Sequence, residues 1–142
     1  EAGLCLYGHH IDTLTTPTQA ALNWAIQKVR RRDGEREGGF PGAPVILDEL
    51  QDGAERKRVG LLPEGRAPMR EGVTLFAGID DAAPIGQITS GGFGPTVGHP
   101  IAIGYVSVAQ AQNGTIIYGE LRGKRLPLTV VALPFTPHNF KR

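Results

Sequence analysis

Three side chains that could do chemistry stand within the first ten residues: Cys5, His9 and His10. Adjacent side chains of a strand point to opposite faces, so His9 and His10 are poorly placed to hold one metal ion. The sequence contains neither H-E-x-x-H nor C-x-x-C, and a thiol nucleophile would need a base and an orienting group beside it. We therefore interpret the histidines as polar residues at the end of a strand and Cys5 as a buried, inert thiol, and we expect no metal site.

A basic triplet, Arg56, Lys57 and Arg58, precedes an apolar run. On a strand Arg56 and Arg58 share one face and Lys57 takes the other. A guanidinium fork suits a carboxylate or a planar acceptor, although a solvated face is an equally simple interpretation. Trp24, the single tryptophan, could pack in a core or form a stacking wall for a flat ligand.

Two further motifs do not indicate a catalytic or phosphate-binding site. The glycine-rich stretch Ser90 to Pro100 lacks the G-x-x-x-x-G-K-[ST] spacing of a phosphate loop and opens no predicted helix, so we expect a long loop that could line a cleft. The acidic pairs Asp48-Glu49 and Asp80-Asp81 are typical of surface and turn charges. No pair of carboxylates for general acid–base catalysis stands out.

The elements that must position these residues differ between the two parts of the chain. A short strand or buried turn is predicted over 2–8, and Thr16-Pro17 indicates the start of a helix that runs to about Arg31. A second helix is predicted from Pro41 to Leu50, with Gly53 ending it.

From Arg56 onward the pattern changes to short apolar runs separated by glycine and proline, which is typical of an antiparallel barrel or sandwich. The last two runs indicate a hairpin that turns at Arg122-Gly123-Lys124. The predicted fold is mainly β with a helical N-terminal piece (α+β). The expected strands lie within 56–63, 73–78, 83–92, 101–108, 114–123 and 124–133.

The composition of the chain argues against several classes of function. The 142 residues include 15 basic and 14 acidic side chains, and this near-balance gives no field that would steer nucleic acid or an anionic membrane. One cysteine cannot build a disulfide framework, which favours a reducing compartment. We expect neither a signal peptide nor a membrane span, because no segment approaches about 18 apolar residues.

Six stretches, in order along the chain, resemble the C-terminal part of the glycine cleavage system T-protein, the aminomethyltransferase family. They are "EAGLCLYGHHID", "GFPGAPVIL", "RKRVGL", "EGRAPMREG", "IGQITSGGFGPTVGHPIAIGYV" and "RGKRLPLTVVALPFTPHNF". The resemblance implies that residues 1–53 end a folate-binding middle domain and that residues 54–142 form the C-terminal antiparallel β-barrel domain. It also implies a fragment, inactive alone, whose catalytic residues lie upstream of Glu1.

The resemblance further implies the reaction and its participants. The full enzyme takes an aminomethyl group from lipoylated H-protein, releases ammonia and forms 5,10-methylenetetrahydrofolate from tetrahydrofolate, without a metal. It implies a bacterial cytoplasmic or mitochondrial matrix location, and no nucleic-acid or membrane partner. The alternative is a non-catalytic T-protein-like module for folate binding or docking.

Three residues match family positions near the folate: Trp24, Arg58 and Phe140. Arg58 is expected to be a positive partner of the folate or a brace of its channel. His10 departs from the family pattern, which usually has Asp there, and a neutral imidazole cannot copy the charge-assisted hydrogen bonds of a carboxylate.

Overall fold

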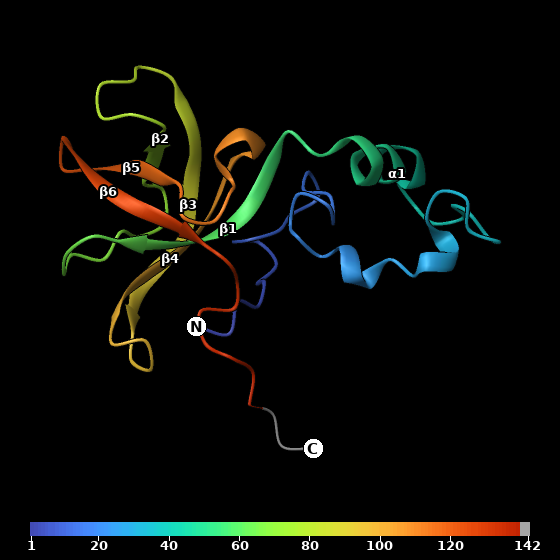
Figure 1. Ribbon diagram of the computed structural model, residues 1–142, viewed down its shortest axis with the longest axis horizontal. Helices are drawn as coiled ribbons and strands as arrows, with labels where there is room; N and C mark the ends of the chain where they lie inside the picture. The colour runs from blue at the N-terminus through green and yellow to red at the C-terminus, as the bar shows by residue number, and fades with distance from the viewer. Residues whose placement is uncertain (140–142) are drawn as a thin grey trace.

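The computed structural model describes residues 1–139, in which six antiparallel strands close into a barrel (Figure 1). The strand order around the barrel is β1-β4-β3-β2-β5-β6. One α-helix and two short 3-10 turns precede the barrel, and a third 3-10 turn follows β4. Their bounds are η1 Asn23–Ala25, η2 Lys28–Arg30, α1 Ala43–Asp52, β1 Arg56–Pro63, β2 Thr74–Phe76, β3 Pro84–Gly94, β4 His99–Ser107, η3 Val108–Gln110, β5 Ile116–Leu121 and β6 Lys124–Val131. The prediction of a mainly β chain with an antiparallel barrel is confirmed.

The barrel forms because apolar side chains alternate along its strands and meet in one core. Leu61, Leu75, Ile117 and Leu128, each from a different strand, are fully buried there. Met69, from the connection between β1 and β2, is also fully buried and completes this core. β4 is buried on both faces from residue 100 to residue 106, because segments outside the barrel cover its outer side.

The hairpin of β5 and β6 turns where the sequence predicts it. Leu121 pairs with Lys124, so Arg122 and Gly123 form a two-residue turn. Both have positive φ, 51° and 73°, which matches the twist of the flanking strands.

The glycine-rich stretch is a hairpin, so the expectation of a long loop there is wrong. Ser90 to Gly94 continues β3, and the pairing with β4 extends from Ser90↔Ile103 to Gly94↔His99. Gly91 permits this path, because a Cβ atom there would lie 1.8 Å from the backbone oxygen of Met69.

The long helix expected from Thr16 to Arg31 does not form. Its start signal acts locally, since Thr16 Oγ1 accepts the backbone N–H of Gln19 at 3.1 Å. Ala21 then has φ of 56°, which ends a right-handed helix, and only η1 and η2 follow. The Arg31 guanidinium donates to the carbonyl oxygens of Asn23 and Ile26, and the Asn23 carbonyl also accepts the Ile26 N–H in a 3-10 turn.

The second helix is confirmed as α1, shifted by two residues, with Pro44 in its first turn and Gly53 at its C-cap. The buried strand or turn expected over 2–8 is wrong. This segment is irregular, Leu4 and Leu6 are 70% and 58% exposed, and Cys5 is half-buried. No described helix is long and apolar enough to cross a membrane.

Candidate functional site

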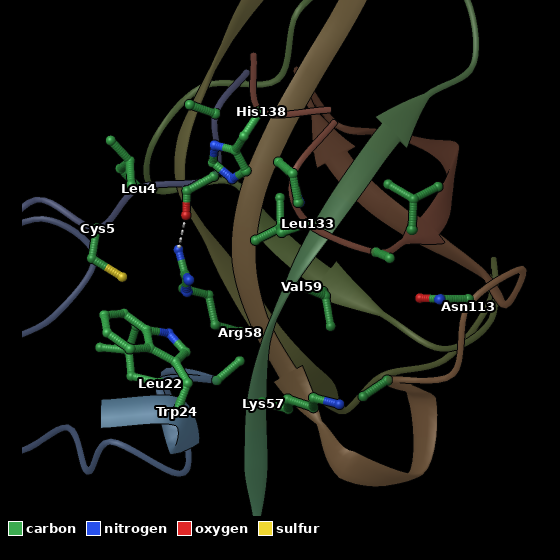
Figure 2. A pocket seen from close by; sticks show the side chains of 17 residues that line it. Leu4, Cys5, Leu22, Trp24, Lys57, Arg58, Val59, Asn113, Leu133 and His138 are labelled. Carbon is green, nitrogen blue, oxygen red and sulfur yellow. Dashed lines mark hydrogen bonds between the residues drawn. The ribbon is translucent and has the colours of Figure 1, made fainter. Parts of the chain in front are cut away.

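A cavity of about 850 Å³ opens where β6 separates from β1. The two strands pair from Gly60↔Val131 onward, so residues 57–59 of β1 have no partner in β6 and form one wall. The other walls come from residues within 2–5, 21–24, 111–113 and 131–138 (Figure 2). Five segments of the chain, β1 included, therefore meet at this opening.

Arg58 is the central side chain of this site. It is 6% exposed, and its guanidinium donates to two backbone oxygens, from Nε to Ala20 and from Nη1 to Gly3, each at 2.9 Å. Its own backbone N–H donates to the carbonyl oxygen of Gln19 at 2.8 Å. Arg58 is therefore not part of a solvated face. It ties β1 to two preceding segments, and a bracing role toward a ligand channel stays a prediction.

Lys57 and Arg58 take opposite sides of β1, as strand alternation predicts (Figure 2). Arg58 points toward Cys5 and Trp24, whereas Lys57 lies on the side of Asn113 and is exposed. The two side chains therefore place positive charge on both sides of β1, with Lys57 exposed and Arg58 buried.

Trp24 stands in η1 at the cavity and is 79% exposed. It is therefore not a core residue, and its ring is available for stacking on a flat ligand. Phe140, the third residue that the resemblance singles out, lies outside the described residues. Among the described lining residues none is Asp or Glu, so the cavity offers binding and positioning groups without a carboxylate base.

The two histidines at the N-terminus have separate partners. His9 Nδ1 lies 3.3 Å from Glu71 Oε2, and His10 Nε2 lies 2.7 Å from Ser90 Oγ. They stand in turns rather than at the end of a strand. Within residues 1–139 no group of three or more His, Cys, Asp or Glu side chains could hold a metal ion.

The contact of His10 with Ser90 resembles a nucleophile and its base, but the hydrogen bonds exclude that role. His10 Nδ1 lies 2.9 Å from the Leu6 N–H and accepts from it, so in the neutral ring the proton sits on Nε2. Nε2 therefore donates to Ser90 and cannot take its proton. Sequence reasoning missed this pair, because 80 positions separate the two residues and no local motif links them.

Tyr105 of β4 is a second residue that sequence reasoning missed. Its hydroxyl donates to the His10 carbonyl oxygen at 2.8 Å, and the Arg56 guanidinium lies 4.8 Å from the centre of its ring. Burial raises the pKa of the Tyr105 hydroxyl to about 12, so this group is a hydrogen-bond donor at neutral pH.

Comparison with known proteins agrees with this geometry. Residues 56–136 match the family described as "Glycine cleavage T-protein C-terminal barrel domain". The chain is 43% identical to the mitochondrial aminomethyltransferase of Dictyostelium discoideum, covering 100% of this chain and 34% of that protein. It is 40% identical to the mitochondrial aminomethyltransferase of Homo sapiens, covering 99% of this chain and 33% of that protein.

A solved structure is also similar. The glycine cleavage system aminomethyltransferase T from Bartonella henselae superposes with a TM-score of 0.84 at 47% identity, covering 95% of this chain and 36% of that one. The chain thus spans about a third of the length of the relatives that it matches. The resemblance noted in the sequence is confirmed, and the chain belongs to the glycine cleavage T-protein family, as its C-terminal part.

Proposed function

We propose that this chain is the C-terminal part of a tetrahydrofolate-dependent aminomethyltransferase of the glycine cleavage system. The observation that carries the proposal is the 43% identity to an aminomethyltransferase over the whole of this chain, together with the same barrel. In the proposed division, residues 1–53 end the folate-binding middle domain and residues 54–142 form the barrel domain.

In the proposed reaction, the aminomethyl group on the lipoyl sulfur of the H-protein passes to tetrahydrofolate. The C–S bond breaks and the sulfur leaves as the lipoyl thiol, the carbon becomes the methylene bridge between two folate nitrogens, and the amine leaves as ammonia. The two protons lost by the folate nitrogens are those gained by the sulfur and the amine. Carbon, nitrogen and protons balance without an oxidant. The protein would act in the mitochondrial matrix or, in a bacterium, in the cytoplasm.

The chemistry of the cavity supports a folate beside it. A folate combines a flat fused ring with carboxylates, and the cavity is lined by the exposed indole of Trp24 on one side of β1 and the exposed ammonium of Lys57 on the other. The apolar side chains of Leu22 and Leu133 also line the cavity. Arg58 holds the walls together and is proposed to brace the channel rather than to pair with the ligand directly.

The proposal that the chain alone is inactive rests on the catalytic groups that the family resemblance places upstream of Glu1. The described lining residues include the imidazole of His138 but no Asp or Glu. The catalytic carboxylates are therefore proposed to come from the rest of the enzyme.

The test uses the longer protein that contains this chain. With aminomethylated, lipoylated H-protein it is expected to release ammonia only when tetrahydrofolate is present, whereas the 142-residue chain alone releases none. Trp24→Ala is expected to raise KM for the folate by about fivefold with a smaller effect on kcat, since a stacking contact contributes about 1 kcal/mol.

Phe93→Ala is the matched control, because this aromatic side chain is 63% exposed and does not line the cavity. Folate binding without ammonia release by the longer protein would favour the non-catalytic module instead.

A further inference from the structure

Residues 1–12, here called the N-terminal segment, lie along the outside of the barrel and are fastened to it at three places. The Glu1 carboxylate accepts the backbone N–H groups of Thr96 and Val97 at 2.7 and 2.8 Å. The Gly3 carbonyl accepts from Arg58, and the His10 carbonyl accepts from Tyr105. Between these points Leu4, Leu6 and Tyr7 are more than half exposed, so packing holds residues 4–9 only weakly.

The imidazole of His10 makes two contacts that hold residues 4–9, beside the exposed contact of His9 with Glu71 and the backbone bond from Gly8 to Ile11. Nδ1 accepts the Leu6 N–H at 2.9 Å and closes the turn of residues 6–10, in which the His10 N–H donates to the Leu6 carbonyl. Nε2 donates to Ser90 Oγ at 2.7 Å and fastens this turn to β3. Only the neutral ring with its proton on Nε2 makes both bonds.

We propose that the N-terminal segment is a pH-sensitive wall of the cavity, released over residues 4–9 when His10 takes up a second proton. That proton goes to Nδ1, which then points an N–H at the N–H of Leu6. The turn that the ring closed must open, and Leu4 and Cys5, which line the cavity, move with it. The inference concerns the conformation of this chain and does not depend on which ligand the cavity binds.

Burial and the charged groups around His10 determine the direction in which its pKa is shifted. Burial, then Arg58 on β1, then the neighbouring His9 lower the pKa of His10 below its ordinary value of 6.5, and Glu71 opposes them. Tyr105 on β4 is uncharged throughout this range. Because the folded-state pKa is the lower one, the stabilisation is complete above pH 6.5 and is lost as the pH falls through the folded value.

Amide hydrogen exchange of the chain tests the proposal. After correction for the intrinsic rate, protection of the Leu6 amide is expected to fall at least about tenfold between about pH 7.5 and about pH 5, while the β5 and β6 amides stay protected. His10→Asn keeps an acceptor for the Leu6 N–H but cannot titrate, so its protection is expected to be independent of pH. His9→Asn removes the exposed neighbour and is expected to keep the wild-type response.

An NMR titration of the unsubstituted chain tests the proposed release of residues 4–9 without any variant. The ring signals of His10 and the amide signals of residues 4–9 are expected to change with one shared midpoint, below 6.5. Amide signals and exchange that stay constant through the His10 titration would overturn the proposal, and so would a His10→Asn chain that still loses its protection at low pH.

Discussion

The Nε atom of Arg58 lies 2.9 Å from the carbonyl oxygen of Ala20, and both residues are buried although 38 positions separate them. This bond and the one to Gly3 fasten two irregular segments to the first strand of the barrel. Neither segment belongs to a sheet or a long helix. The Arg58 side chain therefore supplies hydrogen bonds in place of the backbone hydrogen bonds that a paired strand would form. One guanidinium therefore joins two walls of the cavity to the barrel.

Replacing Arg58 by methionine is expected to lower the free energy of unfolding by about 2 kcal/mol or more, because hydrogen bonds from a charged group are lost and two carbonyl oxygens lose their donor. Urea unfolding followed by circular dichroism measures the change. Arg56→Met is the matched control. Arg56 is exposed and bonds to Gln19, so its loss is expected to cost about 1 kcal/mol or less. Equal losses from the two variants would contradict the role given to Arg58.

Two adjacent glycines of β3 are expected to respond very differently to a single methyl group. In Gly91→Ala the Cβ atom would meet the backbone oxygen of Met69 at 1.8 Å, and a backbone atom cannot move aside as a side chain can. We expect a loss of at least about 2 kcal/mol. The Cβ atom of Gly92→Ala meets nothing within 4 Å, so its effect is expected to stay within about 0.5 kcal/mol. Thermal unfolding of both chains checks the difference.

The barrel could be predicted from sequence because its signals are local. Apolar alternation marks the strands, and the pair Arg122-Gly123 marks a turn, so both were found at the right place. The long helix over 16–31 was wrong because its periodic pattern competes with tertiary contacts. Ala21 adopts a positive φ and the Arg31 guanidinium bonds back to the Asn23 and Ile26 carbonyls, and no propensity of the local residues reveals either feature.

The site was less predictable, since its contacts join distant positions. Trp24 and Arg58 were singled out by residue type and resemblance, and both do line the cavity. The bonds of His10 to Ser90 and of Tyr105 to His10 span 80 and 95 positions, and their residue types match no motif. The stretch Ser90 to Pro100 was interpreted as a long loop, although the strand expected over 83–92 reaches Gly92, because sequence alone does not show that a neighbouring backbone approaches Gly91 closely.

A stabilising substitution is available at the hairpin of β5 and β6. Arg122 has φ of 51°, a left-handed conformation that costs most residues about 1 kcal/mol and costs asparagine or glycine less. Arg122→Asn is therefore expected to raise the free energy of unfolding by about 0.5 kcal/mol and the midpoint temperature by a few degrees. Gly123→Ala, at φ of 73°, is expected to act in the opposite direction. Calorimetry of the two variants measures both signs.

The hydroxyl of Tyr105 is expected to ionise at an unusually high pH. Its pKa in the folded chain is raised from 10.0 to about 12, chiefly by burial, and the phenolate could not donate to the His10 carbonyl. Because the folded pKa is the higher one, the stabilisation is complete below pH 10 and is lost as the pH rises toward 12. The tyrosinate absorbance near 295 nm should therefore still be rising close to pH 12. Tyr105→Phe should remove this late rise. If the late rise stayed unchanged in Tyr105→Phe, the hydroxyl would not be buried in the contact described here.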